Sequence, residues 1–70
     1  MNRAVRMRKQ IIAWMVEFEE PMHTQPGLLE NLTEWCESNA SGTFALPGSW
    51  SHRVAFWNQD DALLCYLTFK

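Results

Sequence analysis

Two histidines and two cysteines are the residues in this sequence best suited to binding a metal: His23, Cys36, His52 and Cys65. A structural zinc site usually takes its ligands from close pairs, such as two cysteines separated by two residues. Here the successive intervals are 13, 16 and 13 residues, so no close pair exists. The spacing therefore argues against zinc, and we predict no metal or cofactor.

Nucleophilic catalysis has one candidate segment, GSWSH, which brings Ser49, Ser51 and His52 together in the sequence. A nucleophilic hydroxyl needs a base within hydrogen-bonding reach. Adjacent residues on a strand point to opposite faces, so Ser51 and His52 are poorly placed to bond each other. A chain of 70 residues also has little volume for a water-excluding pocket. We therefore predict a protein without enzymatic activity.

Charge is distributed very unevenly along the chain. Residues 1–9 have a net charge of +4, residues 10–52 have −6, and the charges of residues 53–70 sum to zero, for a net charge of −2. The acidic segment has six glutamates and no lysine or arginine. A basic partner would relieve the repulsion within such a surface and would be attracted to it over a distance.

Two helices are predicted in the first half of the chain. The apolar residues Ala4, Met7, Ile11, Trp14 and Phe18 recur at steps of three and four, which predicts a helix from about Arg3 to Glu19, ended by Pro21. Its charges oppose the helix dipole, at a cost of about a few tenths of a kcal/mol each, which packing can override. A second helix is predicted from about Pro26 to Ser38, with Thr24 as its N-cap.

The second half of the chain favours strands. The segments HRVAFW and ALLCYLTFK are rich in β-branched and aromatic residues, and NQDD between them is suited to a turn. Residues 43–46 (TFAL) add a possible third strand. The predicted fold is therefore α+β: a single domain over residues 1–70, with two helices on one face of a two- or three-stranded antiparallel sheet, in the order ααβββ.

The predicted partner-binding residues are the glutamates of the helices and the aromatic residues expected outside the core. Glu30, Glu34 and Glu37 stand at i, i+4 and i+7, which predicts one acidic ridge on the second helix. Trp57 and Tyr66 are expected on the outer face of the sheet, and Trp50 in a loop; tryptophan and tyrosine are favoured at interfaces. The full predicted set is Glu17, Glu20, Glu30, Glu34, Glu37, Trp50, Trp57 and Tyr66.

These features favour a small interaction module, a regulator or inhibitor that docks onto a basic surface of another protein, including one that binds nucleic acid. In size and composition the chain is similar in type to the small regulators and inhibitors that phages and plasmids carry, some of which act on host defence proteins. One alternative is weak nucleic-acid binding or a transcription-accessory role through the basic N-terminus: Arg3, Arg6, Arg8 and Lys9. Another is a homodimer held by its tryptophans.

The expected location is the cytoplasm. The apolar part of the N-terminal segment is interrupted by glutamates and lacks a small-residue cleavage site, so it does not match a signal peptide. No stretch has the run of about 18 apolar residues that crosses a bilayer. Two cysteines are consistent with reduced thiols in a reducing compartment.

Overall fold

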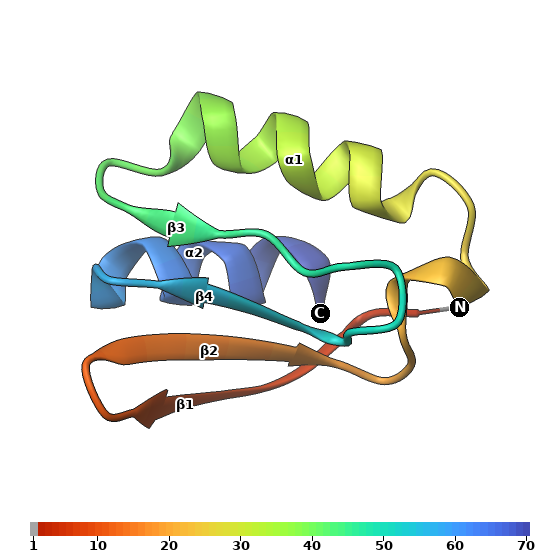
Figure 1. The fold of residues 1–70 in the computed structure, drawn as a ribbon. Coiled ribbons are helices and arrows are strands. Elements are labelled where there is room, and N and C mark those ends of the chain that lie inside the picture. Colours follow the sequence, from red (N-terminus) through yellow and green to blue (C-terminus); the bar gives the residue numbers. More distant parts are fainter. Residues whose placement is uncertain (1) are drawn as a thin grey trace.

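The computed structural model describes residues 2–70 and contains a four-stranded antiparallel sheet and two α-helices (Figure 1). The strands are β1 (Ala4–Gln10), β2 (Ala13–Phe18), β3 (Phe44–Ala45) and β4 (Arg53–Phe56). The helices are α1 (Leu28–Asn39) and α2 (Gln59–Phe69), and a short 3-10 turn, η1 (Met22–Thr24), precedes α1. The element order is therefore ββαββα, and the predicted order ααβββ is wrong.

The sheet has the strand order β1-β2-β4-β3, and every neighbouring pair is antiparallel. Both helices pack on one of its faces. Phe56 of the sheet contacts Trp35 of α1, with 6.4 Å between ring centroids, and Phe18 contacts Phe69 of α2 at 5.9 Å. The predicted α+β class is thus confirmed, whereas the sheet has four strands rather than two or three.

The first segment forms the hairpin β1–β2, so the predicted helix from Arg3 to Glu19 is wrong. Ile11 and Ile12 make the turn between the strands. Ile11 has φ = 58°, a left-handed conformation that two-residue hairpin turns require but that β-branched residues rarely adopt. The absence of glycine, asparagine or aspartate at this turn removed the usual sequence signal for a hairpin.

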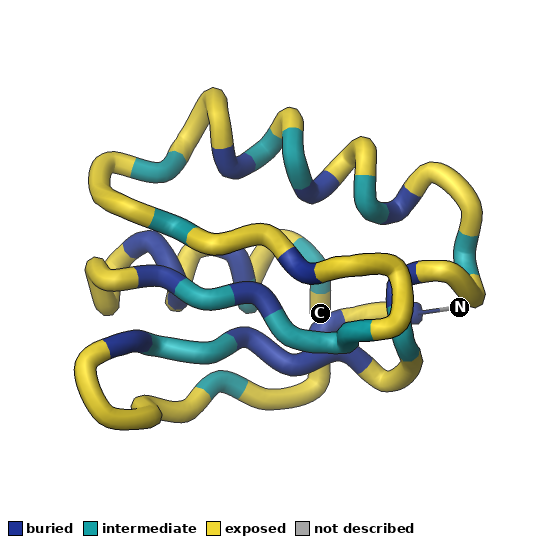
Figure 2. Tube along the Cα trace, in the orientation of Figure 1, coloured by how far each residue is buried: buried dark blue, intermediate teal, exposed yellow. Residues whose placement is uncertain are grey.

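The second predicted helix is confirmed as α1, with slightly different bounds. Its N-cap is Gly27, with φ = 88° and no side-chain cap, whereas the predicted cap Thr24 donates its hydroxyl to the carbonyl of Pro21. The inner side of α1 contributes the buried Leu28, Leu32 and Cys36 to the core. Figure 2 shows the resulting contrast between the buried inner side of α1 and its exposed outer side.

The last segment is the helix α2 rather than the predicted strand. Asn58 caps it, because its side-chain oxygen accepts hydrogen bonds from the backbone N–H groups of Asp60 and Asp61. Two acidic residues in the first turn also suit the positive end of the helix dipole. The segment NQDD is therefore a helix start and not a hairpin turn. The predicted strands at HRVAFW and TFAL are present as β4 and β3.

The core lies between the sheet and the two helices. Val16 and Phe18 of β2 and Val54 and Phe56 of β4 alternate along their strands on the covered face and are fully or almost fully buried. Trp35 of α1 links the sheet to the other helix, since it contacts Phe69 of α2 as well as Phe56, with the Trp35 and Phe69 ring centroids 6.1 Å apart. Over residues 2–70, none of the helices has the length and apolar character required to cross a membrane.

Candidate functional site: an acidic hollow beside α1

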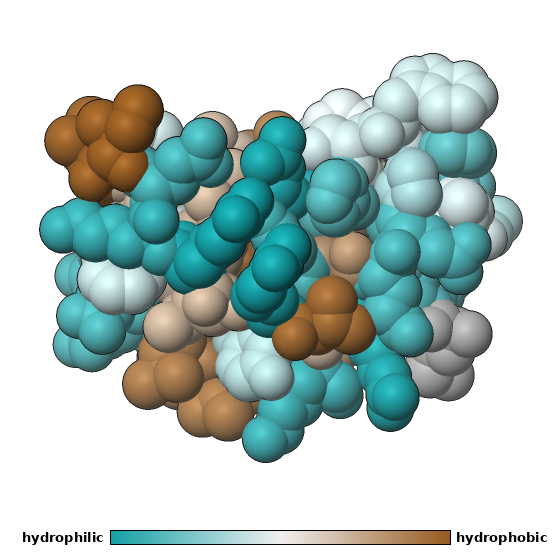
Figure 3. All heavy atoms as spheres, turned by 90° about the horizontal axis from the view of Figure 1, so that it is seen from below, coloured by the Kyte–Doolittle hydropathy of each residue, from teal (hydrophilic) through white to brown (hydrophobic). Residues whose placement is uncertain are grey.

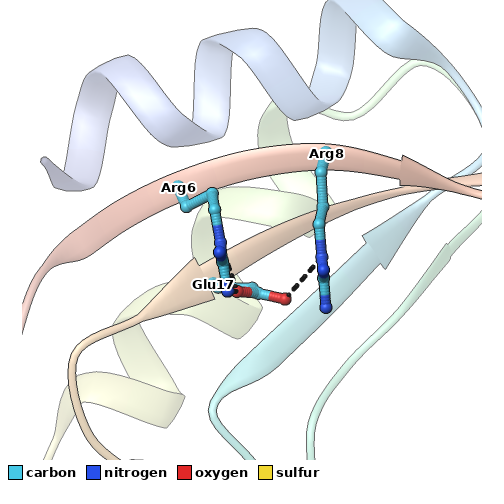
Figure 4. Close-up of polar contacts among 3 residues, drawn as sticks. All are labelled: Arg6, Arg8 and Glu17. Atoms are coloured by element: carbon cyan, nitrogen blue, oxygen red, sulfur yellow. Dashed lines mark hydrogen bonds and ion pairs between the residues drawn. The ribbon is translucent and has the colours of Figure 1, made fainter.

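The open face of the sheet carries a buried carboxylate held by two arginines (Figure 4). Arg6 and Arg8 of β1 lie across from β2 and point toward Glu17, which is only 3% exposed. Arg6 Nε donates to Oε1 of Glu17 at 2.8 Å, and Arg8 Nε donates to Oε2 at 3.0 Å. Arg53 lies directly opposite Glu17 on β4. Three cations therefore surround one carboxylate.

The arginines hold Glu17 in its charged form. Burial alone raises the pKa of Glu17, but the hydrogen bonds and charge of Arg6, together with the charges of Arg8 and Arg53, outweigh burial and bring the pKa below its usual value of 4.5. The expectation that Glu17 lies on an exposed acidic surface is wrong. The next glutamate, Glu19, is exposed and lies 3.7 Å from Arg3, so it too has a nearby cation.

The outer side of α1 is different, because its carboxylates have no such partners in the part of the chain that the structure describes. Glu30, Glu34 and Glu37 are all exposed and fall on one side of the helix, as their spacing predicted. Within residues 2–70, the ion pairs of the molecule involve Glu17 and Glu19 and none of these three. The N-terminal arginines are thus engaged elsewhere, and the negative charge of α1 faces solvent.

A hollow of about 560 Å³ lies between η1 and α1, beside this acidic side. Glu30 and Glu34 contribute to its wall, and Met22, Pro26 and Leu29 supply apolar surface. Backbone hydrogen bonds from Met22 to Ser51 and from His23 to Ser49 fix η1 against the β3–β4 connection. The hollow therefore combines an apolar lining with two carboxylates that form no ion pair within residues 2–70, a combination suited to the aliphatic stem and charged tip of lysine or arginine.

Trp50, one of the predicted partner-binding residues, stands next to this hollow. Its ring lies 4.0 Å from that of His23, which lines the hollow, and Trp50 itself is 80% exposed. His23 Nδ1 is 3.0 Å from the carbonyl oxygen of Ser49, a contact that orients the imidazole ring. The structure thus places Trp50 beside the hollow that Glu30 and Glu34 line, although Trp50 is distant from both in the sequence.

The remaining predicted residues do not join that site. Trp57 is half-exposed at the end of β4, and Tyr66 is half-buried on α2, where it packs against the core. The predicted outer sheet face shared by Trp57 and Tyr66 is therefore wrong, because Tyr66 is not on the sheet. Glu20 is exposed, and its backbone is held by the side chain of Asn2.

Sequence reasoning missed Met22, His23 and Leu29 as residues of the hollow. Their contribution depends on the pairing of η1 with residues 49–51, a long-range contact for which no local pattern exists. It also missed Asp61, whose buried carboxylate accepts hydrogen bonds from the backbone N–H groups of Ser41 and Gly42. Asp61 ties α2 to the α1–β3 connection.

The cysteines are free, buried and unreactive in character. Burial raises the pKa of Cys36 to about 11 and that of Cys65 to about 12, so both thiols stay protonated near neutral pH. Over residues 2–70, the histidine, cysteine, aspartate and glutamate side chains form no group of three or more that could hold a metal ion.

Comparison with protein-family models, with curated protein sequences and with solved structures finds no match for this chain.

Proposed function

We propose that this protein is a small, non-enzymatic interaction module that docks the outer side of α1 onto a basic surface of another protein. The observation that carries the proposal is the unpaired negative charge of Glu30, Glu34 and Glu37, in a molecule whose N-terminal arginines are committed to Glu17 and Glu19. A cationic partner supplies what these carboxylates lack within residues 2–70.

The hollow beside α1 gives the proposed contact an anchor. An arginine or lysine side chain entering it would lay its stem along Met22 and Leu29 and place its charge at Glu30 and Glu34. Trp50 adds a large exposed ring at the same place, and tryptophan is prominent among residues that dominate binding energy. Docking of this kind would make the protein a regulator or inhibitor that covers a basic surface, including a surface that binds nucleic acid.

Peptide display selection against the immobilised protein tests this proposal without knowledge of the natural partner. We expect enrichment of peptides that contain lysine or arginine, and we expect the binding of these peptides to weaken as salt rises. The paired substitution Glu30→Lys/Glu34→Lys should abolish their binding, and Trp50→Ala should weaken it about tenfold or more.

Matched controls lie on other parts of the surface. Glu19→Lys reverses another exposed carboxylate, one that is not on α1, and Trp57→Ala removes another exposed indole. Neither should change peptide binding. Enrichment of neutral or acidic peptides, or binding that survives Glu30→Lys/Glu34→Lys in a folded protein, would overturn the proposal.

Nucleic-acid binding is a second candidate, favoured by the excess of cations on the open sheet face. Arg6, Arg8 and Arg53 meet a single carboxylate there, which leaves a local charge of +2. Arg3 is beside Glu19, and Lys9 lies over the ring of Trp14, 5.8 Å from its centroid. If two phosphates are neutralised, the logarithm of the affinity should fall with that of salt at a slope of about −1.8. Fluorescence anisotropy with labelled DNA, with Arg8→Ala as the variant, measures this slope.

A further inference from the structure

The outer side of α2 is a stripe of exposed leucines. Leu63, Leu64 and Leu67 are 43%, 51% and 48% exposed, while Ala62 and Cys65 on the other side of the helix are fully buried. Spacings of one, three and four residues place the three leucines on one side of a helix. In the view from below, hydrophobic side chains reach the surface in several separate groups, one of them at the lower left margin, around a hydrophilic band in the middle of that face (Figure 3).

Such a stripe is costly for a chain of this size. Burial of apolar side chains drives the folding of small domains, and domains of about 70 residues often gain stability from a partner chain. Of the four exposed leucines within residues 2–70, three belong to α2 and the fourth, Leu46, lies in the β3–β4 connection, whereas α1 buries Leu28 and Leu32. The leucines of α2 are therefore available to a partner and contribute little to the core of the single chain.

The charges at the two ends of the stripe indicate which partner fits it. Asp60 stands in the first turn of α2 and Lys70 directly after its last residue, and both are exposed. The exposed positions between them are uncharged: Leu63, Leu64, Leu67 and Thr68. Residue 65 is midway between Asp60 and Lys70, so the stripe is centred close to Leu64.

A second copy of α2 running in the opposite direction matches this arrangement. A two-fold axis near Leu64 would place leucine against leucine, and it would bring Asp60 of each copy toward Lys70 of the other. The two helix dipoles would also be antiparallel, which is the favourable arrangement. A parallel pair would instead bring like charges together at both ends. The pattern is therefore self-complementary in the antiparallel orientation only.

We propose that two copies of this chain associate through α2, packed antiparallel with the leucine stripes in contact and Asp60 paired with Lys70 at both ends. The interface is separate from the hollow beside α1, so the proposal does not depend on the proposed function. Either can fail without the other.

Analytical ultracentrifugation of the full chain across a concentration series tests the proposal. We expect a two-chain mass at about micromolar concentration, a range typical of modest interfaces. Leu64→Glu or Leu67→Glu should reduce this to a single-chain mass, with an unchanged far-ultraviolet circular dichroism spectrum because both side chains are half-exposed. Leu46→Glu is the matched control: Leu46 is 38% exposed in the β3–β4 connection, and its replacement should leave the two-chain mass intact.

Charge reversal tests the orientation. Asp60→Lys and Lys70→Glu should each weaken association about tenfold, because each brings two like charges together twice. The double variant Asp60→Lys/Lys70→Glu should restore it. A single-chain mass for the unmodified protein at every concentration would overturn the proposal, and the leucine stripe would then have to bind a partner other than a second copy of this chain. Association that withstands Leu64→Glu and Leu67→Glu, or a double variant no better than the single ones, would overturn it as well.

Discussion

The open face of the sheet and the outer side of α1 use their glutamates in opposite ways. Glu17 on the sheet is buried and accepts hydrogen bonds from two arginines of the neighbouring strand, so its charge is neutralised within the fold. Glu30, Glu34 and Glu37 on α1 are exposed, and within residues 2–70 they hold no cation. The first arrangement assembles a hairpin, and the second leaves a charged surface for another molecule.

This difference shows that net charge along the sequence is a poor guide to the charge of the folded surface. The six glutamates of residues 10–52 are one acidic segment in the sequence. Folding removes Glu17 from that segment and places Glu19 beside Arg3, and the unbalanced part contracts to α1 and Glu20. The case for a basic partner therefore rests on α1 and Glu20.

Glu17→Gln is expected to give the largest change in stability. The glutamine keeps the shape of the side chain but leaves Arg6 and Arg8 without a charged partner. Both arginines are about half-exposed and can turn to water, so the loss is limited to about 1.5 kcal/mol in the free energy of unfolding. Urea denaturation measures it.

The control is Glu19→Gln, which removes the exposed carboxylate 3.7 Å from Arg3. Exposed pairs of this kind contribute about 0–1 kcal/mol, so this variant should unfold almost like the unmodified protein. If the two variants lose equal stability, the buried Glu17 contributes no more to the hairpin than the exposed Glu19 does. The open face of the sheet and the outer side of α1 would then not differ in how they use their glutamates.

The free energy of unfolding should also decrease as the pH is lowered, because of Glu17. Its pKa in the folded chain is below the usual 4.5, so the contribution of the arginines is fully present above 4.5 and is lost as the pH falls through the lowered folded pKa. Urea denaturation between neutral pH and pH 3 should therefore show a steeper loss in the unmodified protein than in Glu17→Gln. Parallel curves would mean that Glu17 is not stabilised in its charged form.

The same charges distinguish the hairpin of the first segment from the helix that its apolar spacing predicts. A helix from Arg3 to Glu19 would place its cations and carboxylates at the wrong ends of the dipole, and this conflict is visible in the sequence. In a hairpin the identical pattern is favourable, because Arg6 lies directly opposite Glu17 across the strands. The apolar spacing fitted both structures. The residues of the turn, Ile11 and Ile12, do not predict a hairpin. The only feature of the sequence that favours the hairpin is the unfavourable placement of charges relative to the dipole of a helix.

The elements with local signals were predictable to different degrees. The helix α1, the strand β4 and the exposed acidic side of α1 all follow from nearby residues and are present, although α1 begins and ends at other residues than predicted. The helix α2 could also have been read, because Asn58 followed by Asp60 and Asp61 is a typical helix start. The hollow could not have been predicted from the sequence, because it requires η1 to lie beside residues 49–51, and only the complete fold brings these segments together.

The turn that joins β1 to β2 offers a second, smaller test of the hairpin. Ile11→Gly should raise the free energy of unfolding by about 0.5 to 1 kcal/mol, because glycine adopts a left-handed φ without strain and the isoleucine side chain is 86% exposed. Ile12→Gly should lower it by a similar amount, since that residue does not have a positive φ. Equal effects of the two variants in urea denaturation would show that the turn stores no strain.

The smallest effects are expected on α1, where the carboxylates are not part of the fold. Glu37→Lys should raise the free energy of unfolding by about 0.5 kcal/mol, because it places a cation in the last turn of the helix, three residues after Glu34. Glu30→Lys should change it less, because the loss of an anion from the first turn, where the dipole favours one, is offset by the new pair with Glu34 one turn later. Thermal and urea denaturation of both variants measure these changes. A loss of stability in either variant as large as that expected for Glu17→Gln would show that the carboxylates of α1 stabilise the fold. The outer side of α1 would then not differ from the open face of the sheet, and the proposed docking would lose its basis.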